Sequence, residues 1–114
     1  MAEDALLSLE DAFALDDEDL LEEVGEWLLG SGPGFGPSDI DRKVRFARSW
    51  LDDKRNELRR ELCGPVRDRL ETGGFDAMTE AATVADAVAA AVGKPPANIV
   101  AVILLRRGIR RFCD

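Results

Sequence analysis

Four arginines near the end of the chain are the residues whose type and spacing most directly suggest chemistry. Arg106, Arg107, Arg110 and Arg111 follow an apolar run. In one continuous helix they form two neighbouring i,i+4 pairs, so the four guanidinium groups share one side. The guanidinium fork binds carboxylates and phosphates through paired hydrogen bonds. The spacing predicts a basic partner-binding face, although arginines at a helix C-terminus also stabilise the helix dipole and keep an apolar helix soluble.

A second concentration of charge, of opposite sign, lies near the start of the sequence. Residues 1–30 contain eleven acids and no base, a net charge of −11, whereas residues 31–114 carry twelve acids and fifteen bases, a net +3, which gives −8 for the chain. The acids predicted to form an acidic partner-binding face are Asp16, Asp17, Asp19, Glu22, Glu23 and Glu26. Such a run is either a solvated helix face or a complement to a basic partner, including mimicry of a nucleic-acid backbone.

Catalytic, cofactor and metal sites are not suggested by any residue pattern. The chain has no histidine, so Ser-His and Cys-His arrangements and an ordinary zinc site are excluded. The carboxylates do not follow the calcium-loop pattern of an EF-hand. The glycine-rich stretch 30–37 follows no predicted strand and precedes no Gly-Lys-Ser/Thr, so it is not a phosphate-binding loop. We expect no enzyme activity, no cofactor and no metal.

Cysteine usage and hydropathy bear on the compartment. Cys63 and Cys113 form no CxxC motif, and so few cysteines are more typical of a reducing cytosol than of a disulfide framework, with a single bridge left open. Glu3 and Asp4 are the reverse of the basic start of a signal peptide. Residues 94–96 interrupt the one apolar stretch that approaches a membrane-spanning length. The expected location is cytoplasmic, without a membrane partner.

The elements that position these residues are predicted to be six helices. Apolar spacing places them at about 3–14, 16–29, 38–62, 66–70, 83–92 (which a turn at 76–82 could extend) and 96–113. Asp16 or Asp17 is the expected N-cap of the second helix, and Gly25 within it indicates close packing. Ser38 with Asp41, and Thr83 with Asp86, are predicted capping boxes.

The last helix is the one around which the others are expected to pack. Residues 99–105 are all apolar, so a helix there must be buried on every side. Its expected neighbours are the alanine-rich helix 83–92 and the long helix 38–62, with an acidic helical hairpin, 1–29, capping one side. Residues 30–37 would link that hairpin to the main bundle, 38–114. We therefore predict one all-α domain, a compact bundle of about six helices with a central hydrophobic C-terminal helix.

The function suggested first is binding of another protein. A bundle of six short helices with opposite charges at separate ends is similar in architecture alone to the death-fold class of interaction modules, since no family motif is matched. The leading hypothesis is a non-enzymatic adaptor, or a small subunit of a larger assembly, that binds another protein or itself through charge-complementary helical surfaces. The alternative is nucleic-acid association through the arginine faces, with the acidic hairpin as autoinhibitor or mimic, although an acidic chain disfavours general affinity for nucleic acid.

Overall fold

In the computed structural model, residues 8–29, 39–74, 76–93 and 96–113 are described, and they form eight helices and no strand. The helices are α1 (Leu9–Phe13), α2 (Asp17–Leu29), α3 (Asp39–Asp53), α4 (Arg55–Leu62), α5 (Pro65–Thr72), α6 (Ala77–Val92), α7 (Ala97–Arg107) and α8 (Ile109–Cys113). The predicted all-α class is confirmed. The predicted linker 30–37, the cap residue Ser38 and the predicted helix start at 3–7 lie outside the described residues.

Acidic side chains begin two of the longer helices. The Asp16 carboxylate accepts a hydrogen bond from the Asp19 backbone N–H at 2.8 Å, which confirms the predicted N-cap of α2. In α6 the cap is Asp76, which accepts from the Thr79 backbone N–H at 2.7 Å. The predicted capping box at Thr83 is therefore wrong, because α6 includes the earlier turn. The Thr83 hydroxyl instead donates to the Thr79 carbonyl within the helix, at 3.0 Å.

Two predicted helices are each divided in two, which accounts for the number of elements. The helix predicted at 38–62 bends at Lys54, although its hydrogen bonding continues: the Lys54 N–H donates to the Trp50 carbonyl at 3.0 Å. The apolar spacing is interrupted at the same place in the sequence. The last predicted helix ends at Gly108, whose φ of +94° lies in the left-handed region that glycine adopts at little cost. The chain then starts α8 in a new direction.

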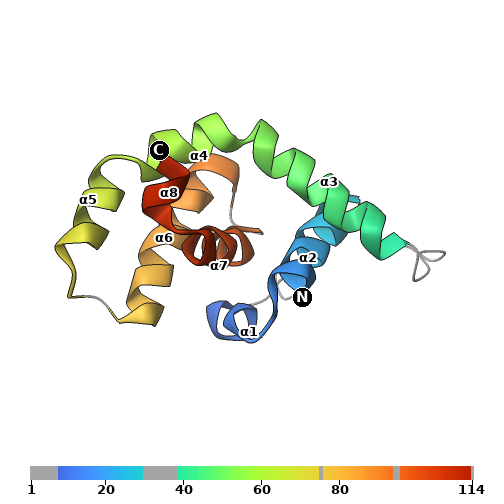
Figure 1. The fold of residues 1–114 in the computed structure, drawn as a ribbon, viewed down its shortest axis with the longest axis horizontal. Helices are drawn as coiled ribbons and strands as arrows, with labels where there is room; N and C mark the ends of the chain where they lie inside the picture. The colour runs from blue at the N-terminus through green and yellow to red at the C-terminus, as the bar shows by residue number, and fades with distance from the viewer. Residues whose placement is uncertain (1–7, 30–38, 75, 94–95, 114) are drawn as a thin grey trace.

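Figure 1 shows α3 and α4 as an arch across the top of the molecule, with α7 near the centre below it. The main neighbour of α7 is α6, as predicted from its small side chains, and α7 also contacts α1, α2 and α8. By contrast, α3 packs mainly on α2, and α4 packs mainly on α6. The expectation that the third helix lies along the last one is therefore wrong, since α6 occupies the place beside α7.

The centre of the core is the apolar run of α7. Each residue from Ile99 to Leu104 is at most 1% exposed, so this helix is buried on all sides, as predicted. The α2–α3 contact is close at Gly25, where an added Cβ would lie within 2.8 Å of the Lys43 Cα. No single helix of the described residues is long and apolar enough to span a membrane, and α6 with α7 meets that criterion only as a pair bent by 118°.

Candidate functional site

The four C-terminal arginines do not share one helix face, because Gly108 separates them into two pairs on α7 and α8. Arg106 points to the N-terminal helices: its Nη1 donates to the Asp17 carboxylate at 3.1 Å and its Nη2 donates to the Phe13 carbonyl at 2.9 Å. Arg110 points the other way, its Nε 3.9 Å from the Glu71 carboxylate of α5. The prediction of a single continuous arginine face is wrong. Partner binding by these residues stays a prediction.

The other two arginines meet a third, from α4, at the edge of a cleft of about 330 Å³. Its lining residues come from α3 and α4, on the two sides of the bend, and from α7 and α8. They are Leu51, Asp52, Arg55, Leu58, Leu104, Arg106, Arg107, Arg111 and Phe112. We call this site the arginine cleft. Of these residues, the sequence pattern had indicated Arg106, Arg107 and Arg111 as part of a binding face. The pattern did not indicate the apolar members, because each of them has ordinary core spacing.

The floor of the arginine cleft is apolar and its rim is cationic. Leu58 and Leu104 are at most 1% exposed and Leu51 is 5% exposed, so the side chains beneath the rim are apolar and belong to the core. Asp52 is the one acid among the lining residues. Counting Asp17, which is paired with Arg106, four guanidinium groups face two carboxylates, which leaves a local charge of +2.

Three of the rim arginines lack an ionic partner among the described residues. Within the described chain, Arg55, Arg107 and Arg111 form no ion pair, although the sequence contains 23 acids and only 15 bases. Arg107 and Arg111 are exposed, as is Arg55. An exposed guanidinium group without a carboxylate partner retains its full capacity to bind an anion from outside the chain.

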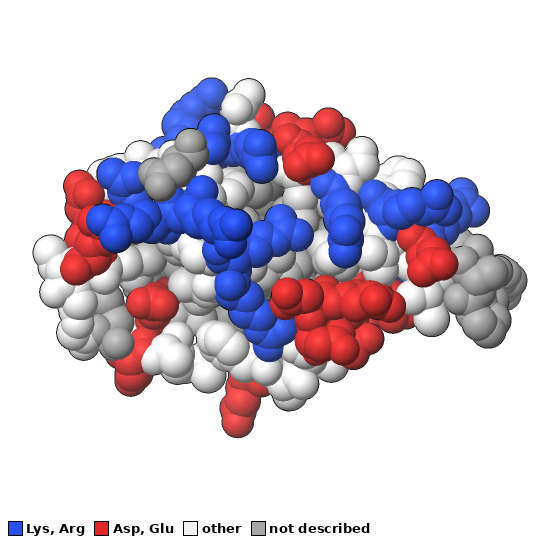
Figure 2. Space-filling view, in the orientation of Figure 1, with Lys and Arg blue, Asp and Glu red and all other residues white. Residues whose placement is uncertain are grey.

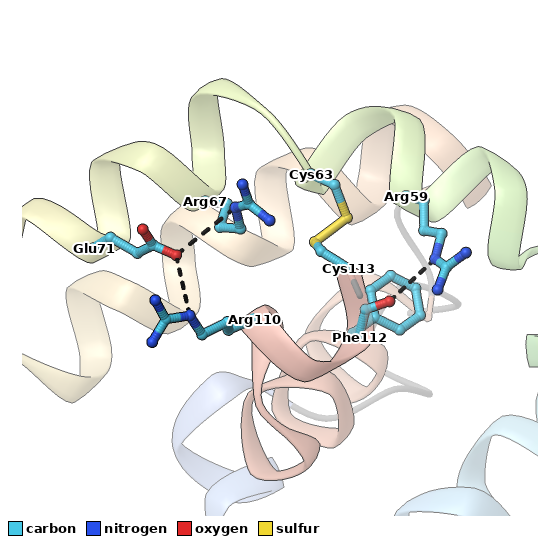
Figure 3. The surroundings of a disulfide bond; sticks show 7 residues. All are labelled: Arg59, Cys63, Arg67, Glu71, Arg110, Phe112 and Cys113. Carbon is cyan, nitrogen blue, oxygen red and sulfur yellow. Dashed lines mark hydrogen bonds and ion pairs between the residues drawn. A yellow bond between two sulfur atoms is a disulfide. The ribbon is translucent and has the colours of Figure 1, made fainter.

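One wall of the arginine cleft is fixed by a covalent bond (Figure 3). A disulfide joins Cys63, after α4, to Cys113, at the end of α8, with the two Cα atoms 5.5 Å apart. This settles the bridge that the sequence had left open. Arg59 adds two contacts between the same helices, because its Nε donates to the Phe112 carbonyl at 3.0 Å and its Cζ lies 6.0 Å from the Phe112 ring centroid. Phe112 is therefore held against α4 by both contacts with Arg59 and by the disulfide of the next residue.

The predicted acidic face lies beside the arginine cleft rather than at a separate end of the molecule. Figure 2 shows Lys and Arg side chains in a band across this face, from the α8 end to the α3 end, with a large group of acidic side chains directly below, over α2. The Arg106–Asp17 pair joins the two charged regions. Glu26 is also partly used within the chain, since its carboxylate lies 3.9 Å from the Lys43 Nζ.

Burial and the neighbouring acids of α2 together raise the pKa of one of its carboxyl groups. Burial raises the pKa of Glu23 above its ordinary 4.5, and the negative charges of Glu26 and Glu22 raise it further, while Lys43 opposes them. The remaining acids of the predicted face, Asp16 and Asp19, lie at the exposed start of α2, where Asp16 is used as the cap. The acidic group is thus packed densely enough for a cationic partner to relieve repulsion.

Neither a metal centre nor a buried polar constellation is found in the described part of the chain. No group of three or more Cys, Asp or Glu residues there could hold a metal ion, and no polar or charged residue there is buried. Comparisons with protein-family models, with curated proteins and with solved structures found no match. The architectural similarity to the death-fold class therefore stays a prediction, and function must be argued from the arginine cleft.

Proposed function

We propose that this chain is a non-enzymatic protein-interaction module, an adaptor or a small subunit of a larger assembly, that binds an acidic surface of its partner at the arginine cleft. The observation that carries the proposal is that Arg55, Arg107 and Arg111 gather in one cleft without an ionic partner in the described part of the chain, although the protein has a net charge of −8. Complementary charge across an interface mainly gives specificity and a faster association rate, both of which weaken with salt.

A protein partner accounts for more of the site than a nucleic acid does. The side chains beneath the rim of the cleft are apolar, which suits an apolar side chain and offers no hydrogen bond to a phosphate group. The acidic group of α2, directly beside the basic band, would repel a continuous phosphate backbone (Figure 2). A folded partner can instead place its own basic residues against α2 while its acids meet the arginines.

The experiment compares two variants with the same change in charge. The cleft variant carries Arg55→Glu, Arg107→Glu and Arg111→Glu. Its control replaces three other exposed arginines that have no ion pair within the described chain, namely Arg48, Arg60 and Arg69. Each triple change removes three positive charges and adds three negative ones, so both proteins go from −8 to −14.

Cross-linked pull-downs with wild type, the cleft variant and the control variant as baits then test the proposal. We expect a partner that wild type and control both capture and the cleft variant loses, with capture weakening as salt rises. Circular dichroism confirms that all three baits are folded. Equal capture by all three, or no salt-sensitive partner at all, would argue against the cleft as the binding surface.

Nucleic-acid association is the second candidate, and one observation favours it. Phe46 on α3 is 47% exposed and has the exposed Arg42 and Arg45 near it on the same helix. An aromatic ring among arginines is the usual combination for stacking and phosphate contact in single-strand binding. Removing the acidic hairpin is not a clean test, because α2 is the main packing partner of α3. A Phe46→Ala variant in a low-salt binding assay with labelled single-stranded DNA tests it instead, and no binding by wild type would end this alternative.

Cytoplasmic localisation stays a prediction. The Cys63–Cys113 bond weighs against it, because disulfides persist mainly in oxidising surroundings. Titration of free thiols in protein purified under non-reducing conditions, with the thiols blocked at lysis, would report the state of the bond in the cell.

A further inference from the structure

We infer that the arginine cleft accepts one large apolar side chain of the partner, flanked on the same segment by carboxylates. This inference rests on the proposed function and specifies the chemistry of the partner's binding segment. It is carried by three features of the cleft: an apolar floor of limited volume, a rim of guanidinium groups from three helices, and one acid at a single end of the rim.

The floor determines the central residue of the segment. Leu51, Leu58, Leu104 and the half-buried Phe112 make the lining beneath the rim apolar, and Phe112 is the most accessible of the four. The cleft volume of about 330 Å³ is at the lower end of the range of about 300–1,000 Å³ for ligand sites. That is enough room for one large aliphatic or aromatic group. A single anchor in a desolvated pocket is also the usual centre of a protein interface.

The rim determines what flanks that residue. Arg55 comes from α4, Arg107 from α7 and Arg111 from α8, so guanidinium groups stand on both walls of the cleft. Carboxylates on either side of the anchor can each reach an arginine and form the paired hydrogen bonds that the fork favours. Asp52 lies on the α3 side. Its negative charge favours an arrangement in which most partner carboxylates lie towards α7 and α8.

The surroundings favour a polypeptide over a small amphiphilic anion. The basic band continues past the cleft in both directions (Figure 2), so an extended acidic segment meets further arginines that a small anion would not reach. A second copy of this chain is a weaker occupant. Its one exposed large apolar residue near acids, within the described residues, is Met78, and there Asp76 already caps α6 while Glu80 is half-buried.

Synthetic peptides test this chemistry directly. Three fluorescein-labelled peptides of equal length are compared by anisotropy: one with a central Phe among glutamates, one with Ser in place of the Phe, and one with Gln in place of the glutamates. We expect the first to bind at least about tenfold more tightly than either of the others. The double variant Arg107→Glu with Arg111→Glu should bind the first peptide about tenfold more weakly or worse than wild type. The matched double variant Arg48→Glu with Arg60→Glu should lose less than about twofold in affinity.

A second readout locates the site without relying on variants. In ¹H–¹⁵N spectra of the wild-type chain, the first peptide should shift the amide signals of Leu58, Leu104 and Arg111 before those of α5. Equal binding of the Ser peptide would overturn the inference by showing that charge alone is recognised. Shifts confined to α5 would overturn it by placing the site elsewhere.

Two further outcomes separate this inference from the proposed function. If no peptide binds, yet the pull-down partner is still lost in the cleft variant, the partner uses other chemistry and only the inference fails. If light scattering shows a dimer or larger species that Met78→Asp dissociates, the occupant is a second copy, and the inference of a separate partner is overturned.

Discussion

Loss of the Cys63–Cys113 bond is expected to lower the free energy of unfolding by about 4 kcal/mol. The bond joins residues 50 positions apart in the sequence. For a closed loop of that length, the loop-closure entropy removed from the unfolded chain is about 14 cal/mol/K, which corresponds to about 4 kcal/mol at 25 °C. Domains of this size are stable by only about 5–15 kcal/mol, so the bond supplies a large fraction of the total. At about 4 °C per kcal/mol, Tm should fall by about 16 °C.

Urea unfolding followed by tryptophan fluorescence measures this loss. Trp27 and Trp50 pack edge to face, with ring centroids 5.7 Å apart, on α2 and α3, outside the loop that the disulfide closes. Their signal therefore reports whether unfolding of the whole domain, and not only of α8, responds to the bond. Wild type with and without reductant is compared with a double variant carrying Cys63→Ala and Cys113→Ala, which should not respond to reductant.

A loss smaller than about 1 kcal/mol would refute this reasoning. It would mean that the unfolded chain is already restricted in the region between the two cysteines, or that the bond strains the folded state by as much as it restricts the unfolded one. A loss confined to the α8 end would leave the tryptophan transition unchanged while amide exchange in α8 rises. That pattern would assign the bond a local role only.

Three smaller changes test contacts elsewhere in the fold. Gly25→Ala should destabilise by about 2 kcal/mol in urea, because overpacking against the Lys43 backbone outweighs a helix-propensity gain of about 1 kcal/mol; an unchanged midpoint would show that α2 and α3 separate easily. Glu23→Gln should stabilise the protein at pH 7. Burial raises the folded pKa of Glu23, so wild type loses stability as pH rises from about 4.5 through that pKa. A difference in stability between variant and wild type that persists at pH 3 would contradict the linkage. Asp76→Ala should lower Tm at pH 7. Because hydrogen bonds from Thr79 lower the folded pKa of Asp76, the difference in Tm should disappear as pH falls through that lowered pKa. Equal Tm values at pH 7 would show that the cap contributes nothing.

The parts of the fold that follow from local patterns could be predicted from the sequence. The uninterrupted apolar residues 99–105 require burial on all sides, and Ile103 is indeed 1% exposed. Asp16 before an acidic turn and Gly93 after an alanine-rich stretch mark helix ends through their own backbone chemistry. These signals depend on residues within one or two turns of each other, so no tertiary knowledge is needed to interpret them.

The break at Gly108 was missed for a reason that the sequence itself contains. Leu105, Ile109 and Phe112 keep helical spacing across the glycine, so the apolar pattern indicated one continuous helix. Gly93 and Gly108 both end a helix in the left-handed conformation, but at Gly108 the apolar residues on either side conceal this signal in the sequence. As a result, the four arginines that were expected on one surface are separated. Arg106 pairs with α2, Arg110 pairs with α5, and Arg107 and Arg111 line the arginine cleft.

The arginine cleft could not be predicted, because every contact that defines it is distant in sequence. Arg106 and Asp17 are 89 positions apart, and the Arg59 bond to Phe112 spans 53. The first depends on the packing of α2 against α7, and the second on the contact of α4, which follows the bend at Lys54, with α8. Composition indicated that opposite charges exist in the chain, whereas only the packing places them side by side.

The same disulfide also determines how the chain responds to a pulling force. Tension applied between a point before Cys63 and a point after Cys113 passes through the disulfide directly from residue 63 to residue 113. The helices α5 to α8 are thereby shielded from the load while the bond lasts. Reduction should lengthen the extended chain by about 175 Å, because the 50 positions closed by the bond are released at about 3.5 Å per residue. An optical trap would record the difference as a second rise in extension that appears only when reductant is added.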